Sequence, residues 1–224
     1  MRKVIVGAQV SLDGVMQAPG GPREDPTSGF KFGGWAMPHF DDVAGEEISR
    51  LFAEPFDLLL GRKTYEIFAA YWPYQGAGAP AAGIAELFNS ITKYVVSRSG
   101  DVDTGWRGTE LLRDIAAVKR LRGQDGPNLV TQGSTELVHA LFENDLVDAL
   151  SVFTVPVVLG GGKKLWDGGA APQAFRLEAS RVTPNGVIVG HYERGGAVKT
   201  AAAPALDSPS ARERARQERM KREG

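Results

Sequence analysis

The sequence predicts one α/β domain, built on a mixed and mainly parallel β-sheet and followed by a polar tail. Two observations lead to this prediction. Apolar runs with strand character alternate with helical patterns up to about residue 144, which is typical of parallel strands joined by helical crossovers. The last strand-like runs then follow one another without room for helices, so we expect the sheet to end in antiparallel strands.

The elements can be assigned in order along the chain. Apolar runs, several of them rich in β-branched residues, predict strands at 4–10, 57–61, 93–97, 128–132, 149–159, 174–182 and 186–193. Helical patterns lie between them at about 41–54, 62–70, 83–90, 109–122 and 134–144. We expect the helix at 109–122 to begin at Thr109 as its N-cap and to stop near Gly123. The TPNG stretch (183–186) predicts a tight hairpin between the last two strands.

The tail differs in composition from the rest of the chain. It begins as a stretch rich in Gly, Ala, Pro and Ser, which is typical of a linker. Its last part has the pattern of a short polar helix, with Ser210 and Glu213 at the spacing of a capping box. Such a helix has no apolar face to bury. We therefore expect one domain at 1–195 and a disordered polar tail at 196–224.

Composition excludes several classes of protein. The formal net charge is −1, so no surplus of basic residues points to nucleic acid or to an anionic membrane as a partner. No apolar run is long enough to span a bilayer, and the first residues lack the pattern of a signal peptide. The chain has no cysteine, and its 3 histidines show no metal-binding spacing, so we expect no metal. These features fit a cytoplasmic protein.

The glycine-rich stretch LGGGKKLW (159–166) suggests a phosphate-binding loop, but its spacing does not fit one. A P-loop requires glycine where Val157 stands and Ser or Thr where Lys164 stands. A dinucleotide fingerprint requires its third glycine at Leu165. The spacing therefore favours a flexible turn, with a loop at the rim of a pocket as the alternative.

Three other turns are better suited to phosphate groups. GRKT (61–64) and GST (133–135) each follow a predicted strand and open a helix, where backbone N–H groups attract phosphate oxygens. Ser97 and Arg98 follow a third strand. Ligands of open parallel sheets bind at the carboxyl ends of the strands, so these three turns together predict a nucleotide site.

The stretches VSLDGVMQAPGG, GGWAMPHFDD, LLLGRKTYEIF, YVVSRS, QGSTELV and LVDALSVFTVPVVLGGGKKLW occur in this order over nearly all of residues 1–193. Together they resemble the dihydrofolate reductase-like family, which includes the reductase domain of bifunctional riboflavin-biosynthesis proteins. The resemblance implies a dihydrofolate reductase-like fold and NADPH as the cofactor. It also implies that Ala8 lies beside the nicotinamide, that SLDG (11–14) is a mobile loop over it, and that Ser97 and Arg98 lie near the 2′-phosphate. The implied cofactor-binding residues are Ala8, Gly61, Arg62, Lys63, Thr64, Ser97, Arg98, Gly133, Ser134 and Thr135.

The carboxylate that binds the pterin ring in dihydrofolate reductases has no counterpart at the expected spacing. Counting by the family's spacing leads to Gly45 or Ala44. Glu46 is the candidate catalytic acid on this helix, and Asp13 is the candidate in the loop. The alternatives are that Glu46 and Glu47 are both solvated helix acids and that Asp13 is a turn residue.

Trp35 is predicted to bind the substrate, with a core aromatic as the alternative. We expect an NADPH-dependent reductase that transfers a hydride to a small heterocyclic substrate, which is dihydrofolate-like or resembles a pyrimidine of the riboflavin pathway. The second hypothesis is a nucleotide-binding protein of the same fold without turnover.

The family resemblance and the apolar run at 150–159 predict a homodimer, with a buried central strand as the alternative reading of that run.

Overall fold

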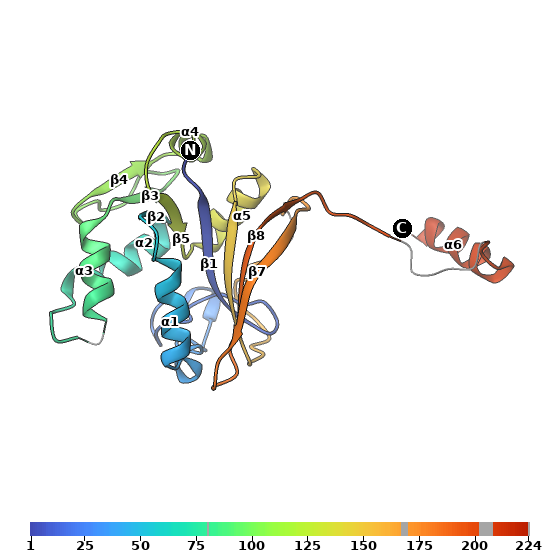
Figure 1. Cartoon of the computed structure of the whole chain (residues 1–224), viewed down its shortest axis with the longest axis horizontal. Coiled ribbons are helices and arrows are strands. Elements are labelled where there is room, and N and C mark those ends of the chain that lie inside the picture. Colours follow the sequence, from blue (N-terminus) through green and yellow to red (C-terminus); the bar gives the residue numbers. More distant parts are fainter. Residues whose placement is uncertain (80, 167–169, 202–207, 224) are drawn as a thin grey trace.

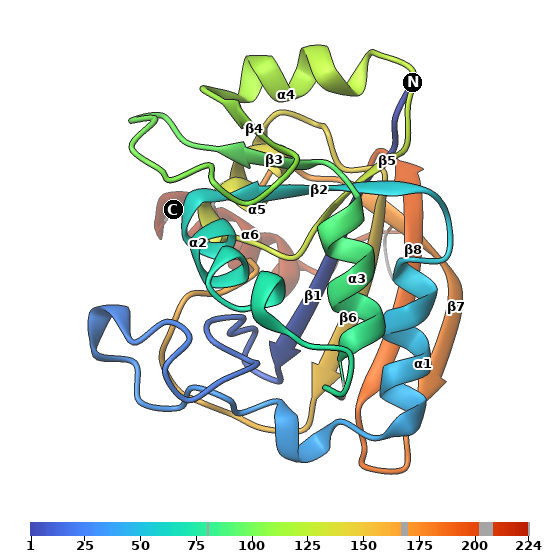
Figure 2. The same cartoon turned by 90° about the vertical axis from the view of Figure 1, so that its left-hand side faces the viewer.

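A computed structural model describes residues 1–79, 81–166, 170–201 and 208–223. Its centre is an 8-stranded sheet in the order β4-β3-β2-β5-β1-β6-β8-β7, drawn in two views in Figures 1 and 2. The strands are β1 (Val4–Ser11), β2 (Phe56–Gly61), β3 (Lys93–Val96), β4 (Thr109–Leu112), β5 (Asn128–Thr131), β6 (Ala149–Val155), β7 (Ala174–Val182) and β8 (Ile188–Gly196). The α-helices are α1 (Asp42–Leu51), α2 (Arg62–Ala69), α3 (Ala82–Ser90), α4 (Ile115–Arg122), α5 (Thr135–Glu143) and α6 (Ala211–Glu223).

The strand directions agree with the prediction of a mixed, mainly parallel sheet. Strands β1 to β6 pair with one another in parallel, whereas β8 is antiparallel to both β6 and β7. The predicted hairpin is confirmed as well. Gly186 donates its N–H to the carbonyl of Thr183 over 2.9 Å and has a φ of +83°, a conformation that favours glycine.

The helices cover the two faces of the sheet. Val4, Val6 and Ala8 of β1 belong to one core, together with residues of α4 and α5. The intervening residues face α1: a Cβ added to Gly7 would lie 2.5 Å from the Leu51 side chain, so glycine lets this helix pack directly on the strand. Helices α1, α2 and α3 enclose a second core around β2, and Figure 2 looks onto this side. The turns that follow the carboxyl ends of β2, β3 and β5 line one cavity.

The predicted helix at 109–122 is wrong in its first half. Thr109–Leu112 forms β4, an edge strand that pairs in parallel with β3, and the helix begins after Asp114. The Asp114 carboxylate accepts the N–H of Ala117 over 2.7 Å, so Asp114 is the N-cap in place of Thr109. The apolar residues of β4 had fitted the helical pattern because a run this short does not reveal its period.

Strand β6 also departs from its predicted bounds. The apolar run was expected to continue to residue 159, but β6 ends at Val155, immediately before Pro156, which has no N–H for the ladder. Strand β6 lies between β1 and β8, so both of its edges are hydrogen-bonded within the chain. It is a central strand, and the homodimer remains a prediction.

The tail ends in helix α6, drawn apart from the sheet in Figure 1. Ser210 accepts the N–H of Glu213 over 3.1 Å, as the capping pattern predicted. None of the residues of α6 described by the structure is buried. Within the described ranges, no helix combines the length and apolarity needed to cross a bilayer, and no group of acidic and histidine side chains has the arrangement of a metal site.

Candidate cofactor and substrate cavity

Two of the three predicted phosphate turns touch each other. The turn from β2 to α2 contains Gly61, and the turn from β5 to α5 contains Gly133 and Ser134. The N–H of Gly61 donates to the carbonyl of Gly133 over 3.1 Å. A Cβ on Gly61 would lie 2.9 Å from the backbone nitrogen of Ser134, and one on Gly133 would lie 2.7 Å from Oγ1 of Thr64. Both glycines are therefore required by this close approach.

The helices that follow these turns begin without a side-chain cap. The N-cap of α2 is Gly61, which has no side chain to cap the helix. The N-cap of α5 is Ser134, whose hydroxyl accepts no hydrogen bond from the helix. The N–H groups of both first turns are thus available to an external acceptor, and the helix dipoles favour an anion there. Lys63 and Thr64 add a cation and a hydroxyl group at the start of α2. Arg62 at the same turn forms an exposed pair with Glu66, in which Nη1 and Oε1 are 2.8 Å apart.

The third turn follows β3. The Ser97 hydroxyl is buried and accepts the N–H of Gly100 over 3.2 Å, which shapes the turn. The next residue, Arg98, is exposed and lines the same cavity as the other two turns. This turn therefore combines a fixed hydroxyl group with a cation that can bind a phosphate in a bidentate manner.

One cavity of about 1590 Å³ unites the three turns. This volume exceeds that of a site for one drug-sized ligand, so a nucleotide and a second small molecule can occupy it together. The structure brings all ten residues predicted to bind the cofactor to the wall of this cavity, namely Ala8, Gly61, Arg62, Lys63, Thr64, Ser97, Arg98, Gly133, Ser134 and Thr135.

The adjacent acids of α1, Glu46 and Glu47, lie outside the cavity. The cavity is lined by Ile48 and Phe52, about 40° apart around the helix. Glu46 is about 160° from Ile48 by the same geometry, and it forms an exposed ion pair in which Arg181 Nη1 is 2.7 Å from its Oε2. The structure therefore does not bring the predicted catalytic acid Glu46 to the cavity.

Glu47 is not the solvated acid that the alternative expected. It is 5 % exposed and accepts a hydrogen bond from Nε2 of His191 over 2.8 Å. The other ring nitrogen of His191 bonds with the hydroxyl of Ser151 over 2.9 Å. Burial alone would raise the pKa of Glu47, but the hydrogen bonds from His191 and Arg181 outweigh it and lower the pKa. This network joins α1 to β6 and β8.

Gly45 and the buried Ala44 are the two positions to which the family's spacing assigned the missing carboxylate. Gly45 is about 60° from Ile48 around α1 and is exposed, and it is not among the described residues that line the cavity. A Cβ added there would have no heavy atom within 4 Å. The position is therefore open, and a side chain would fit without repacking.

Asp13 connects two loops. Its carboxylate accepts a hydrogen bond from the Ser11 hydroxyl over 2.7 Å and the N–H groups of Leu159 and Gly160 over 3.0 and 2.9 Å. These hydrogen bonds, with that from Ser11 the strongest, lower the pKa of Asp13 to about 2. Asp13 is not among the described residues that line the cavity, and its contacts tie the glycine-rich loop to the end of β1.

The predicted substrate residue Trp35 lies behind the cavity wall. It is buried in a core with Phe153, and its Nε1 donates to the carbonyl of Gln17 over 2.8 Å. Gln17 in turn accepts the N–H of Lys163 over 3.0 Å, and Lys163 pairs with Asp25. Trp35 and the glycine-rich loop thus support the cover loop, defined as residues 16–25. Lys163 of the glycine-rich loop lines the cavity. This agrees with the alternative interpretation of the glycine-rich stretch as a loop at the rim of a pocket.

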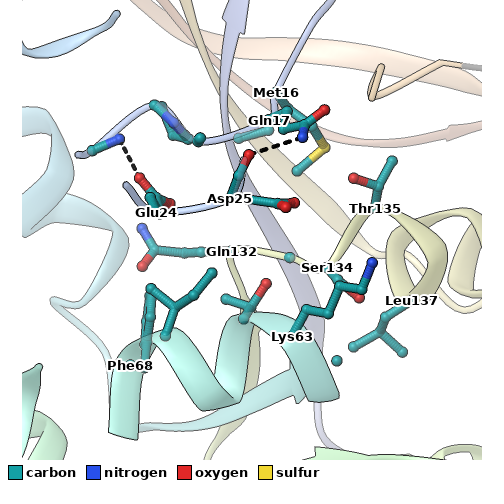
Figure 3. Close-up of a pocket in the computed structure, with 18 of the residues that line it drawn as sticks. Met16, Gln17, Glu24, Asp25, Lys63, Phe68, Gln132, Ser134, Thr135 and Leu137 are labelled. Carbon is teal, nitrogen blue, oxygen red and sulfur yellow. Dashed lines mark hydrogen bonds between the residues drawn. The ribbon is translucent and has the colours of Figure 1, made fainter. Parts of the chain in front are cut away.

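Sequence reasoning missed the residues at the other end of the cavity. Figure 3 shows Glu24 of the cover loop on the same side of the cavity as Gln132 and Phe68, whereas Ser134 and Thr135 lie on the opposite side. We call the first side the substrate end. Other lining residues are linked to this side by their contacts: Phe52 and Phe68 both pack on Phe88, Ile48 packs against the core that contains Phe153, and Gln9 is paired with Phe153 across β1 and β6.

Gln9 adds an unusual polar atom to this region. Its Oε1 is fully buried and has no hydrogen-bond partner among the described residues. A buried acceptor without a partner is costly, so a ligand that donates an N–H or O–H to it would gain binding energy. Strand alternation alone could have placed Gln9 on the face opposite Ala8, but no pattern indicated that this face is a binding surface.

Comparison with known proteins agrees with this architecture. The family model for the RibD C-terminal domain matches residues 2–189. The uncharacterized protein YwjB of Bacillus subtilis (strain 168) is 25 % identical over 197 residues, which span 86 % of this chain and 98 % of YwjB.

Two solved structures have the same fold. A pyrimidine reductase-like protein from Corynebacterium diphtheriae superposes with a TM-score of 0.58 at 13 % identity, over 86 % of this chain and 92 % of that one. The dihydrofolate reductase of Enterococcus faecalis, complexed with NADP(H), superposes with a TM-score of 0.55 at 12 % identity, over 86 % and 96 %. The fold is therefore dihydrofolate reductase-like.

Proposed function

Because the chain belongs to the RibD C-terminal domain family, we propose that it is an NADPH-dependent reductase of a small heterocyclic substrate. The observation that carries the proposal is the single cavity in which three phosphate-binding turns meet a second, largely apolar end. A cofactor and a substrate that must react need such a shared space, because hydride transfer requires direct contact between them.

The cofactor end suits NADPH in its chemistry. The open N–H groups at the starts of α2 and α5 match a pyrophosphate, and Arg98 matches an additional phosphate on the adenosine ribose. Ala8 lines the same cavity and is the residue expected beside the nicotinamide. Bound NADPH supplies the hydride, while the chain orients the reactants and excludes water.

The substrate end suits a flat ring with polar edges. Aromatic and aliphatic side chains from α1, α2 and β6 provide its walls, and Gln9 offers an acceptor for an N–H group. A dihydrofolate-like or pyrimidine-like ring has these properties. The fold shared with a pyrimidine reductase-like protein and with a dihydrofolate reductase supports the same substrate class.

One observation favours the second candidate function, nucleotide binding without turnover. None of the acids of α1 lines the cavity: Glu46 pairs with Arg181 at the surface, and Glu47 is hydrogen-bonded to His191. A protein that only binds the nucleotide needs the three turns and no acid.

Two measurements distinguish these functions. NADPH binding is followed by the fluorescence of the reduced nicotinamide, and turnover by its loss of absorbance with a panel of dihydropterins and aminopyrimidinones. The reductase binds NADPH and oxidises it with at least one member of the panel. Binding without oxidation supports the second function, and absence of NADPH binding contradicts both.

A further inference from the structure

The cavity contains several acids, and their surroundings differ. The acidic residues among the described lining are Glu24, Asp25, Asp114, Glu136 and Glu143. Asp114 caps α4, Glu136 and Glu143 are exposed on α5, and Asp25 pairs with Lys163. Glu24 is the acid among them that is partly buried and has no ion pair in the described part of the chain. It lies at the substrate end (Figure 3).

The cover loop holds the Glu24 carboxyl group by one oxygen. Oε2 accepts the N–H of Gly20 over 2.6 Å and that of Gly21 over 2.9 Å. Both hydrogen bonds found for this group within the described residues go to Oε2, so Oε1 is left for a ligand. A glutamine side chain in this place keeps an oxygen for the two glycines and loses only the ionisable proton.

The electrostatic surroundings keep a proton on this group to higher pH than usual. Burial raises the pKa of Glu24, and the nearby charge of Asp25 raises it further, against the hydrogen bonds from Gly20 and Gly21, which lower it. Lys163 is neutralised by Asp25. The other charged residues that line the cavity are Arg23 and Asp25 of the same loop, Lys163 of the glycine-rich loop, Arg62 and Lys63 of α2, Arg98 after β3, Asp114 before α4, and Glu136 and Glu143 of α5.

We propose that Glu24 is the acid of this cavity, and that it exchanges a proton with a basic ring nitrogen of the molecule at the substrate end. This inference rests on the proposed reductase function. In the reductive step, the proton from Glu24 forms the new N–H bond and a hydride adds to the neighbouring carbon, so a C=N bond becomes CH–NH. The two electrons come from NADPH, which leaves as NADP⁺, and the Glu24 carboxylate regains its proton from water.

The test uses 2,4-diaminopyrimidine, a basic ring whose ultraviolet spectrum reports its protonation. Binding to the full chain is measured by calorimetry and by the difference spectrum, at a pH at which the free ring is neutral. We expect the ring to become protonated on binding, and the affinity to fall as pH rises further. Glu24→Gln should weaken binding by about 10- to 100-fold, which is the loss of one charge-assisted hydrogen bond. It should also abolish ring protonation.

Two comparisons keep the result unambiguous. Glu86→Gln changes an exposed acid of α3 that does not line the cavity, and it should leave probe binding and ring protonation unchanged. If Glu24→Gln does not fold, glutamate-labelled wild-type protein is titrated by ¹³C NMR. A carboxyl signal with a raised pKa must then shift when the probe binds.

The assignment of Glu24 is overturned if the probe binds as a neutral ring, if it binds equally well to Glu24→Gln, or if it does not bind at all. NADPH affinity, measured on the same samples, tests the proposed function separately. If the probe binds in its protonated form and NADPH does not bind, the assignment of Glu24 stands and the proposed reductase function is contradicted.

Discussion

The two ends of the cavity are built in different ways. The cofactor end consists of turns in which a strand passes directly into a helix or a bend, so each binding group lies within a few residues of a glycine or serine in the sequence. The substrate end assembles β1, α1, α2 and the cover loop, which are distant along the chain. Local motifs therefore predict the proposed nucleotide site, whereas the residues proposed to bind and protonate a substrate come together only through tertiary packing.

The largest expected effect is at the junction of the two phosphate turns. Gly61→Ala would place a methyl group 2.9 Å from the backbone of Ser134, so the turns must separate. We expect NADPH affinity to fall by more than about 100-fold, because both helix N-termini lose their alignment. Fluorescence titration measures this loss.

Gly45→Ala is the matched control for that change. Its Cβ meets nothing within 4 Å, and alanine in a helix is more stable than glycine by about 0.5–1 kcal/mol. Thermal melting should show a small gain with unchanged NADPH affinity. If Gly61→Ala behaves like Gly45→Ala, the contact between the turns has no role in binding.

The acids of α1 provide a second contrast. Glu47→Gln should lower the free energy of unfolding by about 1.5–3 kcal/mol near neutral pH, because a buried charge-assisted hydrogen bond to His191 is lost. The pKa of Glu47 is lowered in the folded state, so this stabilisation is present above the ordinary glutamate pKa. It is lost as pH falls through the folded pKa. Urea unfolding of both proteins at several pH values measures the difference.

Glu46→Gln should have a much smaller effect, about 0–1 kcal/mol, because it removes only an exposed ion pair. If Glu46 were the catalytic acid, as the sequence suggested, Glu46→Gln would instead lower turnover by about 10²- to 10⁴-fold. Turnover with any substrate found in the panel decides between the two. A large loss in Glu46→Gln would show that α1 does supply the acid and that Glu24 does not.

Arg98 sharpens the comparison within the cofactor end. Arg98→Ala should weaken NADPH binding by about 1–3 kcal/mol and leave NADH binding nearly unchanged, because its proposed partner is the 2′-phosphate. Parallel titrations with the two nucleotides measure this. Equal losses for both would assign Arg98 to a group that they share.

The smallest effect is expected for the tail. Deletion of residues 197–224 should leave melting temperature and NADPH affinity unchanged, because none of the described residues of α6 is buried. A clear decrease in melting temperature would show that the tail stabilises the domain.

Much of the fold could be predicted from the sequence because hydrophobic periodicity and turn residues act locally. The strand carrying Ala8 and the hairpin at Gly186 are examples. Thr109 was assigned to a helix because β4 is a short edge strand whose identity depends on its pairing with β3. The cofactor turns followed from their motifs.

Glu24 and Gln9 could not be found in the same way. Glu24 lies in a loop without periodicity, and its pKa is raised by burial that exists only after the cover loop has packed. Gln9 is polar on a strand whose other face is core, which is compatible with simple solvent exposure. For Glu46 and Glu47, adjacency in the sequence concealed opposite environments, since one is exposed and the other is 5 % exposed.

The open space at Gly45 has a consequence for how the protein could diversify. Most changes near a binding cavity must first overcome the cost of displacing packed neighbours. A larger side chain introduced at Gly45 would displace none. Position 45 can therefore vary in size and charge at little cost in stability, which makes this part of α1 tolerant of sequence change.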